Sequence, residues 1–132
     1  RIGTGPVRVA IIAWGTMVLE ACTAAANTIS RDGGAIEIVD LRTLIPFDEE
    51  TIRAAIKDAN RVLVVTEEPD LTSYGRYIHS WIVQHCFYEL DSTPGFISGL
   101  KSHAAPYNAV EEMAFFPSAP LIEEKIAELL AE

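Results

Sequence analysis

The sequence is poor in basic residues and contains no long hydrophobic run. Lys and Arg number 10 against 19 Asp and Glu, so the formal net charge is −9. A general nucleic-acid binder or a binder of anionic membranes is therefore excluded, because no basic patch is present to neutralise phosphates. No apolar run approaches the roughly 20 residues that span a bilayer, so no transmembrane segment is predicted. A protein partner with a basic surface would complement this negative charge better than a nucleic acid or an anionic membrane would.

Cysteine is also scarce, which argues against a disulfide scaffold. Cys22 and Cys86 both fall within apolar helical patterns, and we expect buried free thiols rather than a disulfide. A signal peptide is not predicted, because residues 1–6 lead straight into an apolar strand pattern. The expected compartment is the cytoplasm or, in a eukaryote, the mitochondrial matrix.

The apolar pattern alternates between short continuous runs and helical spacing. At 132 residues, 49% of them hydrophobic, the chain suits one domain, residues 1–132. Strands are predicted at residues 7–13, 36–39, 61–66 and 96–98, and helices at residues 16–30, 49–59, 73–90 and from 117 onward. This order predicts an α/β fold of three αβα layers, with a mostly parallel open sheet between helices.

Capping residues and apolar faces sharpen the helix predictions. Thr16, Asp48 and Ser73 are predicted to cap the first three helices. Four residues of each of these three helices are predicted to face the sheet. They are Val18, Cys22, Ala25 and Ile29 in the first helix, Ile52, Ala55, Ile56 and Ala59 in the second, and Ile78, Ile82, Cys86 and Leu90 in the third. The last helix points Ile122, Ile126 and Leu129 inward.

Polar residues follow the third predicted strand, where open α/β sheets usually place their ligands. Glu67, Glu68 and Asp70 could bind a cation or act as a base, although a solvated acidic loop is the favoured interpretation. Gly75, at a helix start, indicates a close backbone approach. The histidines at 79, 85 and 103 have no metal-ligand spacing and are interpreted as structural or solvated.

Glycines elsewhere do not form a nucleotide cradle. Gly3-Thr4-Gly5-Pro6 precedes a strand instead of following one, and Ala13-Trp14-Gly15-Thr16 has only one glycine. Cys86 and His85 are neighbours on a helix and therefore point apart, which argues against a nucleophile with its base. Residue chemistry alone thus predicts no self-sufficient catalytic set.

The most distinctive sequence motif of the chain follows the second predicted strand and continues into an acidic helix start. Further segments accompany this motif: an earlier strand with its turn, the third strand, a glutamate, a glycine and a Phe-Pro-Ser near the end. In order, these are Val9-Ala10-Ile11-Ile12-Ala13-Trp14-Gly15-Thr16, Asp40-Leu41-Arg42-Thr43-Leu44-Ile45-Pro46-Phe47-Asp48, Arg61-Val62-Leu63-Val64-Val65, Glu68, Gly75 and Phe116-Pro117-Ser118. On these residues the chain resembles the C-terminal domain of transketolase-like thiamin diphosphate enzymes. It is most similar to the beta subunit of the E1 component of 2-oxo acid dehydrogenase complexes, acting on pyruvate or branched-chain substrates.

The resemblance implies that the chemistry lies outside this chain. Thiamin diphosphate and Mg²⁺ would sit between two other domains of the parent, so no catalytic, cofactor-binding or metal-binding residue is expected here. Residues 7–13 would form the central strand, flanked by 36–39 and 62–65, with 96–98 outside. The family adds an antiparallel edge strand near the N-terminus. Its presence is left open here, because Arg1 resembles a cut within a longer polypeptide.

The resemblance also implies partners. They would be an E1 alpha subunit or domain, a second E1 beta chain and the E2 acyltransferase. We hypothesise that Glu67, Glu68, Tyr74 and Arg76 form the edge facing the rest of the enzyme. Lys101, in the loop 101–107, and the last helix form a second hypothesis, for E2 docking. The alternatives are the C-terminal domain of a transketolase or deoxyxylulose-phosphate synthase, or a free-standing flavodoxin-like binding module.

Overall fold

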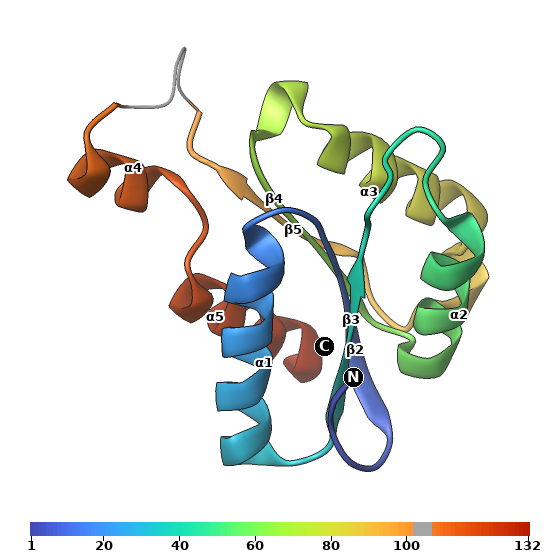
Figure 1. Ribbon diagram of the computed structural model, residues 1–132. Coiled ribbons are helices and arrows are strands. Elements are labelled where there is room, and N and C mark those ends of the chain that lie inside the picture. Colours follow the sequence, from blue (N-terminus) through green and yellow to red (C-terminus); the bar gives the residue numbers. More distant parts are fainter. Residues whose placement is uncertain (102–106) are drawn as a thin grey trace.

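The computed structural model describes residues 1–101 and 107–132 and arranges them around one five-stranded sheet (Figure 1). The strands are β1 (Ile2–Gly3), β2 (Val7–Ala13), β3 (Ala35–Asp40), β4 (Val62–Pro69) and β5 (Gly95–Gly99), in the order β1-β3-β2-β4-β5. β3, β2, β4 and β5 run parallel, and β1 pairs antiparallel with β3. The predicted strand order is confirmed. The antiparallel edge strand, whose presence the sequence did not decide, is present as β1.

Helices cover both faces of the sheet, which confirms the three-layer prediction (Figure 1). The helices are α1 (Met17–Asp32), α2 (Glu49–Ala59), α3 (Tyr74–His85), α4 (Ala109–Phe115) and α5 (Ala119–Ala131). α1 and α5 share one apolar core with the sheet, and α2 and α3 share the other. Among the described residues, no helix is long and apolar enough to cross a bilayer.

β2 explains why a continuous apolar run specifies a central strand. Val9, Ile11 and Ala13 pack into the core under α1 and α5, whereas Ala10 and Ile12 pack into the core under α2. Successive side chains of a strand point to opposite faces, so a strand buried on both sides needs apolar residues throughout. All five side chains are fully buried.

The predicted apolar faces of α2 and α5 are confirmed, but that of α1 is rotated. The α1 residues that are buried are Met17, Ala21, Ala24, Ala25 and Thr28. Ala25 is buried as predicted, and Val18 and Ile29 are partly buried and still pack against the same core, so the prediction was wrong only for Cys22. α1 packs against both the sheet and the neighbouring α5, and its small alanines allow both to approach closely.

Two element boundaries differ from the predictions. Residues 67–69 were predicted as loop, yet β4 continues to Pro69, because pairing with β5 resumes at Pro69 and Gly99 beyond an irregularity. The third helix was predicted to reach Leu90, but α3 ends at His85 and a short 3₁₀ turn follows at Phe87–Glu89. Leu90 is therefore outside the helix, although it still packs against the core.

Candidate functional site

Four parallel strands place their carboxyl ends along one edge of the sheet, at the top of Figure 1. The segments that follow β2, β3, β4 and β5 all gather at this edge, which we call the carboxyl edge. Ligands of open α/β sheets usually bind there. The residues singled out from the sequence, Glu67, Glu68, Tyr74, Arg76 and Lys101, all lie on or beside it.

Glu67 and Glu68 accept hydrogen bonds from different segments of the chain, because adjacent residues of a strand point to opposite faces of the sheet. Glu67 Oε2 accepts a 2.7 Å hydrogen bond from the hydroxyl of Thr16, just before α1. Glu68 Oε2 accepts a 2.6 Å hydrogen bond from the backbone N–H of Tyr74, the first residue of α3. Ser73 caps the same helix by accepting from the N–H of Arg76, as predicted. Thr16, however, makes no side-chain capping bond to α1, so that prediction was wrong.

Arg76 is held between a carboxylate and an aromatic ring. Its guanidinium donates to Asp70 and lies 3.9 Å from the centre of the Phe96 ring. Lys101 Nζ lies 4.0 Å from the second oxygen of Asp70. The hydrogen bond from Arg76 is the largest cause that holds the pKa of Asp70 below its ordinary value, and it raises the pKa of Arg76. Asp70 is therefore ionised at neutral pH and serves as the centre of a small ion-pair network.

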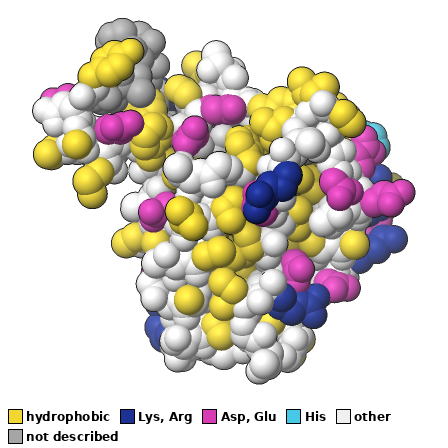
Figure 2. Space-filling model, in the orientation of Figure 1, with side chains coloured by type: hydrophobic (Ala, Val, Ile, Leu, Met, Phe, Trp, Pro, Cys, Tyr) yellow, Lys and Arg dark blue, Asp and Glu magenta, His cyan; other side chains and the backbone are white. Residues whose placement is uncertain are grey.

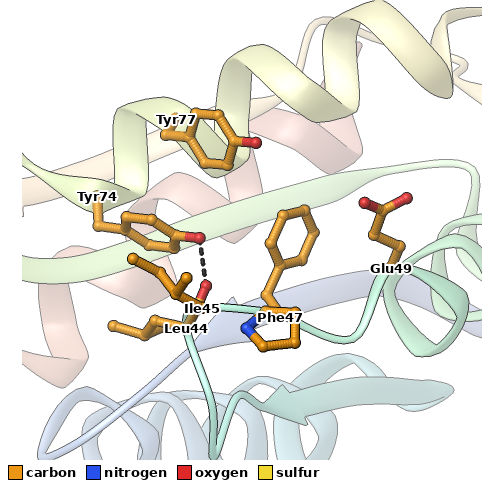
Figure 3. A pocket seen from close by; sticks show the side chains of 7 residues that line it. Leu44, Ile45, Phe47, Glu49, Tyr74 and Tyr77 are labelled. Carbon is orange, nitrogen blue, oxygen red and sulfur yellow. Dashed lines mark hydrogen bonds between the residues drawn. The ribbon is translucent and has the colours of Figure 1, made fainter.

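An aromatic hollow of about 310 Å³ lies between the β3–α2 loop and α3 (Figure 3). The Tyr74 hydroxyl donates to the carbonyl of Leu44 and so ties the loop to the helix. Phe47 meets the Tyr77 ring edge-on, with the ring centres 6.0 Å apart. Glu49, the first residue of α2, stands at the rim. Burial raises the pKa of Tyr74, so its phenol remains a hydrogen-bond donor.

Large apolar side chains are exposed along the carboxyl edge. Ile45, after β3, is 86% exposed, and Leu71, after β4, is 82% exposed. Leu19 in the first turn of α1 and Leu100 after β5 are exposed as well. Figure 2 shows hydrophobic surface over the β3–α2 loop and over α4, at the same edge. Contiguous exposed apolar surface of this kind, over the β3–α2 loop and over α4, marks an interaction surface more often than scattered apolar side chains do.

The acidic residues do not converge on a cation site. Glu67 faces α1, Glu68 caps α3 and Asp70 pairs with Arg76, so each carboxylate has its own partner. Among the described residues, no group of three or more His, Cys, Asp or Glu side chains could hold a metal ion. The geometry therefore favours a structural edge over a proton-transfer or metal centre.

Other residues considered from the sequence have structural roles. His79 and His85 each place a ring nitrogen within hydrogen-bonding distance of a backbone carbonyl, of Pro94 and Trp81 respectively. Both cysteines are free thiols, and Cys86 is buried whereas Cys22 is half-buried. A Cβ atom at Gly75 would lie 2.9 Å from Thr66 Cγ2, so the predicted close approach is confirmed. His103 lies outside the described residues.

Sequence reasoning missed the bond between Thr16 and Glu67 and the exposure of Ile45 and Leu71. Thr16 was interpreted only as a cap, since a hydrogen bond over 51 residues has no local signal. The apolar residues were detectable in principle, because Ile45 and Leu71 stand among loop-forming residues. The peptide bond between Ile45 and Pro46 is cis.

Known proteins are similar to this chain in sequence, and solved structures are similar to it in fold. The family model of the transketolase C-terminal domain matches residues 5–122. The 2-oxoisovalerate dehydrogenase beta subunit of Pseudomonas aeruginosa is 35% identical over 107 residues, 81% of this chain and 29% of that protein. The mitochondrial beta 2 subunit of the same enzyme from Arabidopsis thaliana is 30% identical over 89% of this chain and 32% of that one. The pyruvate dehydrogenase E1 beta subunit of Leifsonia xyli is 30% identical over 92% of this chain and 35% of that subunit.

Among solved structures, an inactive beta4 tetramer of a split-gene transketolase superposes with a TM-score of 0.77 at 17% identity, covering 96% of this chain and 40% of that one. The 2-oxoglutarate:ferredoxin oxidoreductase of Magnetococcus marinus gives a TM-score of 0.64 at 15% identity, covering 96% of this chain and 18% of that one. These two likenesses show the fold alone. The chain spans 29 to 35% of the length of the three relatives named above. It belongs to the transketolase C-terminal domain family, and its relatives there include beta subunits of branched-chain and pyruvate dehydrogenases.

Proposed function

We propose that this chain is the C-terminal assembly and partner-docking domain of a thiamin diphosphate-dependent 2-oxo acid dehydrogenase E1. It would be part of a separate beta subunit or of a fused E1. The parent would oxidatively decarboxylate a 2-oxo acid and transfer the acyl group to the lipoyl arm of E2. The observation that carries the proposal is the 30 to 35% identity to E1-type beta subunits over 81 to 92% of this chain. The compartment would be the cytoplasm or, in a eukaryote, the mitochondrial matrix.

The cofactors belong to the parent in this proposal. Thiamin diphosphate, bound with Mg²⁺ between other domains of the parent, would supply the chemistry of decarboxylation. The described residues of this chain do not provide the oxygen cluster that Mg²⁺ prefers, since their carboxylates are each engaged separately. In this proposal the chain contributes surfaces for subunit assembly and partner docking. The isolated domain should catalyse neither decarboxylation nor acyl transfer.

The carboxyl edge would face the E1 alpha part and the second beta chain. Support comes from Ile45 and Leu71, which are exposed after β3 and after β4. The same edge carries the hydrogen bond from Tyr74 to Glu68 and the ion pair of Arg76 with Asp70. Glu68→Ala in the parent should weaken assembly or lower turnover, because it removes the carboxylate that fixes the start of α3. Glu124→Ala, an exposed acid in the middle of α5, is the matched control. A Glu68→Ala parent with an unchanged dimer and full turnover contradicts this role.

Lys101 and the last helix are two further proposed contacts for E2. They lie at opposite ends of the sheet, because Lys101 follows the carboxyl end of β5 whereas Leu129, near the end of α5, accepts a hydrogen bond from Arg61 just before β4. Lys101 is exposed and lies beside Asp70, whereas residues 102–106 of the same loop are outside the described residues. Replacing Lys101 and trimming residues 130–132 should reduce the affinity of the parent for E2, measured by calorimetry. An unaltered affinity removes both contacts from the proposal.

The activity itself is tested on the parent polypeptide, supplied with thiamin diphosphate and Mg²⁺. Decarboxylation of pyruvate and of branched-chain 2-oxo acids is followed with an artificial electron acceptor, and ketol transfer from a sugar phosphate is measured in parallel. Turnover of a 2-oxo acid alone supports E1 and names the substrate class. Ketol transfer alone contradicts E1 and favours the transketolase alternative. If neither activity is detected, the result contradicts both the E1 and the transketolase assignments and favours the binding-module alternative.

A further inference from the structure

A second hollow at the carboxyl edge combines an apolar floor with an acidic rim. It lies between the start of α1, α4 and the segment before α5, and its volume is about 620 Å³. Met17, Met113 and Phe116 supply the apolar part, and Glu20, Glu67 and Glu112 supply the charge. In Figure 1, α4 stands away from the body of the domain, above α1 and α5. We call this hollow the acidic groove.

The apolar lining of the acidic groove is open to solvent on the α4 side. Met113 is 80% exposed, and Phe116 is partly buried against the core shared by α1 and α5. Methionine side chains are flexible and adapt to the shape of an occupant. An exposed methionine beside an aromatic ring therefore suits contact with the apolar stem of an incoming side chain.

The charged side chains that line the groove are all acidic, among the residues that the structure describes. Glu20 accepts a 2.8 Å hydrogen bond from the N–H of Ala119 at the start of α5, and Glu67 accepts from Thr16. These bonds fix the positions of two carboxylates, each of which retains a second oxygen as an acceptor. Glu112, on α4, is exposed and completes the rim. The groove thus offers preorganised acceptors to a cation.

We propose that the acidic groove holds an arginine or lysine with adjacent apolar side chains, supplied by another chain of the parent assembly. The inference rests on the proposed function and names the chemistry of one partner segment. Charge complementarity selects a basic segment over an acidic or neutral one. A second copy of this chain is a poor donor, because it carries a net charge of −9 and pairs many of its own arginines with acids. Those are Arg1, Arg31, Arg42, Arg61 and Arg76.

The occupant can be identified by crosslinking in the intact parent assembly. A photoreactive amino acid in place of Met113 should form crosslinks to another chain, and mass spectrometry should locate them within a few residues of an Arg or Lys next to apolar residues. The same group in place of Ala54, exposed on α2 at the other face of the sheet, is the control and should not reach that segment. Crosslinks to an acidic segment, to the same domain of a second copy, or to no other chain overturn the proposal.

A charge reversal tests the electrostatic part with a closely matched control. Glu111 and Glu112 both lie in the first turn of α4, but only Glu112 lines the groove. Glu112→Lys should raise the dissociation constant of the assembly about tenfold or more, while Glu111→Lys changes it less than about twofold. Added salt should narrow the difference between the two variants. Equal effects of both variants, or none from either, overturn the proposal.

These readouts do not depend on the reaction of the parent. If 2-oxo acid turnover is absent but the Met113 crosslink reaches a basic segment, the proposed function is contradicted and the proposal for the acidic groove is supported. If turnover is present and Glu112→Lys behaves like Glu111→Lys, the groove fails and the proposed function stands.

Discussion

Thr16 and Glu67 join the carboxyl ends of two neighbouring strands, β2 and β4, through a 2.7 Å hydrogen bond between the threonine hydroxyl and Oε2 of the glutamate. The bond connects the start of α1 to a residue that lines the acidic groove. It therefore links the packing of α1 to the position of a charge at the proposed interface.

Thr16→Val removes this donor while keeping the shape of the side chain. We expect the free energy of unfolding to fall by about 0.5–1 kcal/mol, at the low end for a hydrogen bond because Thr16 is exposed and water replaces part of it. Urea denaturation of the isolated chain measures the change. Thr43→Val, at an exposed loop position after β3, is the control. Equal losses in both variants would mean that the bond to Glu67 contributes nothing measurable.

Local sequence patterns predicted the strands and two helix faces well. The apolar run of β2 and the spacing of Ile52 and Ile56 in α2 depend on neighbouring residues only, and the structure buries them as expected. The strand order also followed from the family resemblance. In both cases the signal lies within one element or in a motif that spans one junction.

The remaining features depend on contacts between distant segments. The rotation of α1 follows from the way α5 packs against it, about 100 residues later in the chain. The bonds of Thr16 to Glu67 and of Glu20 to Ala119 span 51 and 99 residues. Threonine and glutamate side chains can form hydrogen bonds with several nearby groups. The sequence alone therefore does not identify the distant partner that the fold brings into contact.

Gly75 is the position where a single methyl group should disturb the packing of α3 on the sheet. A Cβ atom there would lie 2.9 Å from Thr66 Cγ2 and 3.1 Å from Phe96 Cε2. Overpacking of this kind costs about 1–3 kcal/mol, and the helix propensity of alanine offsets up to about 1 kcal/mol. Gly75→Ala should therefore lower the free energy of unfolding by about 1–2 kcal/mol in urea denaturation.

A double-mutant cycle identifies the clash. Thr66→Ser removes the Cγ2 methyl but keeps the hydroxyl, so Gly75→Ala should cost less in the Thr66→Ser background than in the wild type. An equal cost in both backgrounds would show that Thr66 is not the limiting contact. A Gly75→Ala chain as stable as the wild type contradicts the close approach itself.

Asp48 should contribute to the acid sensitivity of the domain. Its carboxylate accepts hydrogen bonds from the hydroxyl and the N–H of Thr51, and these bonds hold its pKa below the ordinary value in the folded chain. A pKa lower in the folded than in the unfolded state gives stability that is present above the unfolded pKa, near pH 4. This stability is lost as the pH falls through the folded pKa.

Asp48→Asn keeps a capping side chain but removes the titration. We expect the melting temperature of the wild type to fall more steeply from pH 5 to pH 3 than that of Asp48→Asn, measured by circular dichroism. Asp32 and Asp70, whose pKa values are also lowered, remain in both proteins and so cancel in the comparison. Parallel curves would show that the cap has no electrostatic part.

Ile45 should matter for assembly and hardly at all for folding. Its side chain is 86% exposed, so Ile45→Ser should change the free energy of unfolding of the isolated chain by less than about 0.5 kcal/mol. In the parent, the same change should weaken subunit association, measured by sedimentation velocity over a concentration series. Leu71→Ser, also exposed at the carboxyl edge, should act in the same direction. Unchanged association in both variants would remove this edge from the proposed interface.

The two thiols should differ sharply in reactivity. Cys86 is fully buried after α3, and burial is the largest cause that raises its pKa, against the opposing charge of Arg53. Cys22 is half-buried on α1. Since the thiolate is the reactive form and must reach solvent, Cys22 should react with an aromatic disulfide reagent at least about tenfold faster than Cys86 in the native chain. Cys22→Ser should abolish the fast phase and Cys86→Ser should leave it unchanged, whereas both thiols should react rapidly in urea. Two equally fast native thiols would contradict the burial of Cys86, and two unreactive ones that appear only after reduction would indicate a disulfide in place of the free thiols.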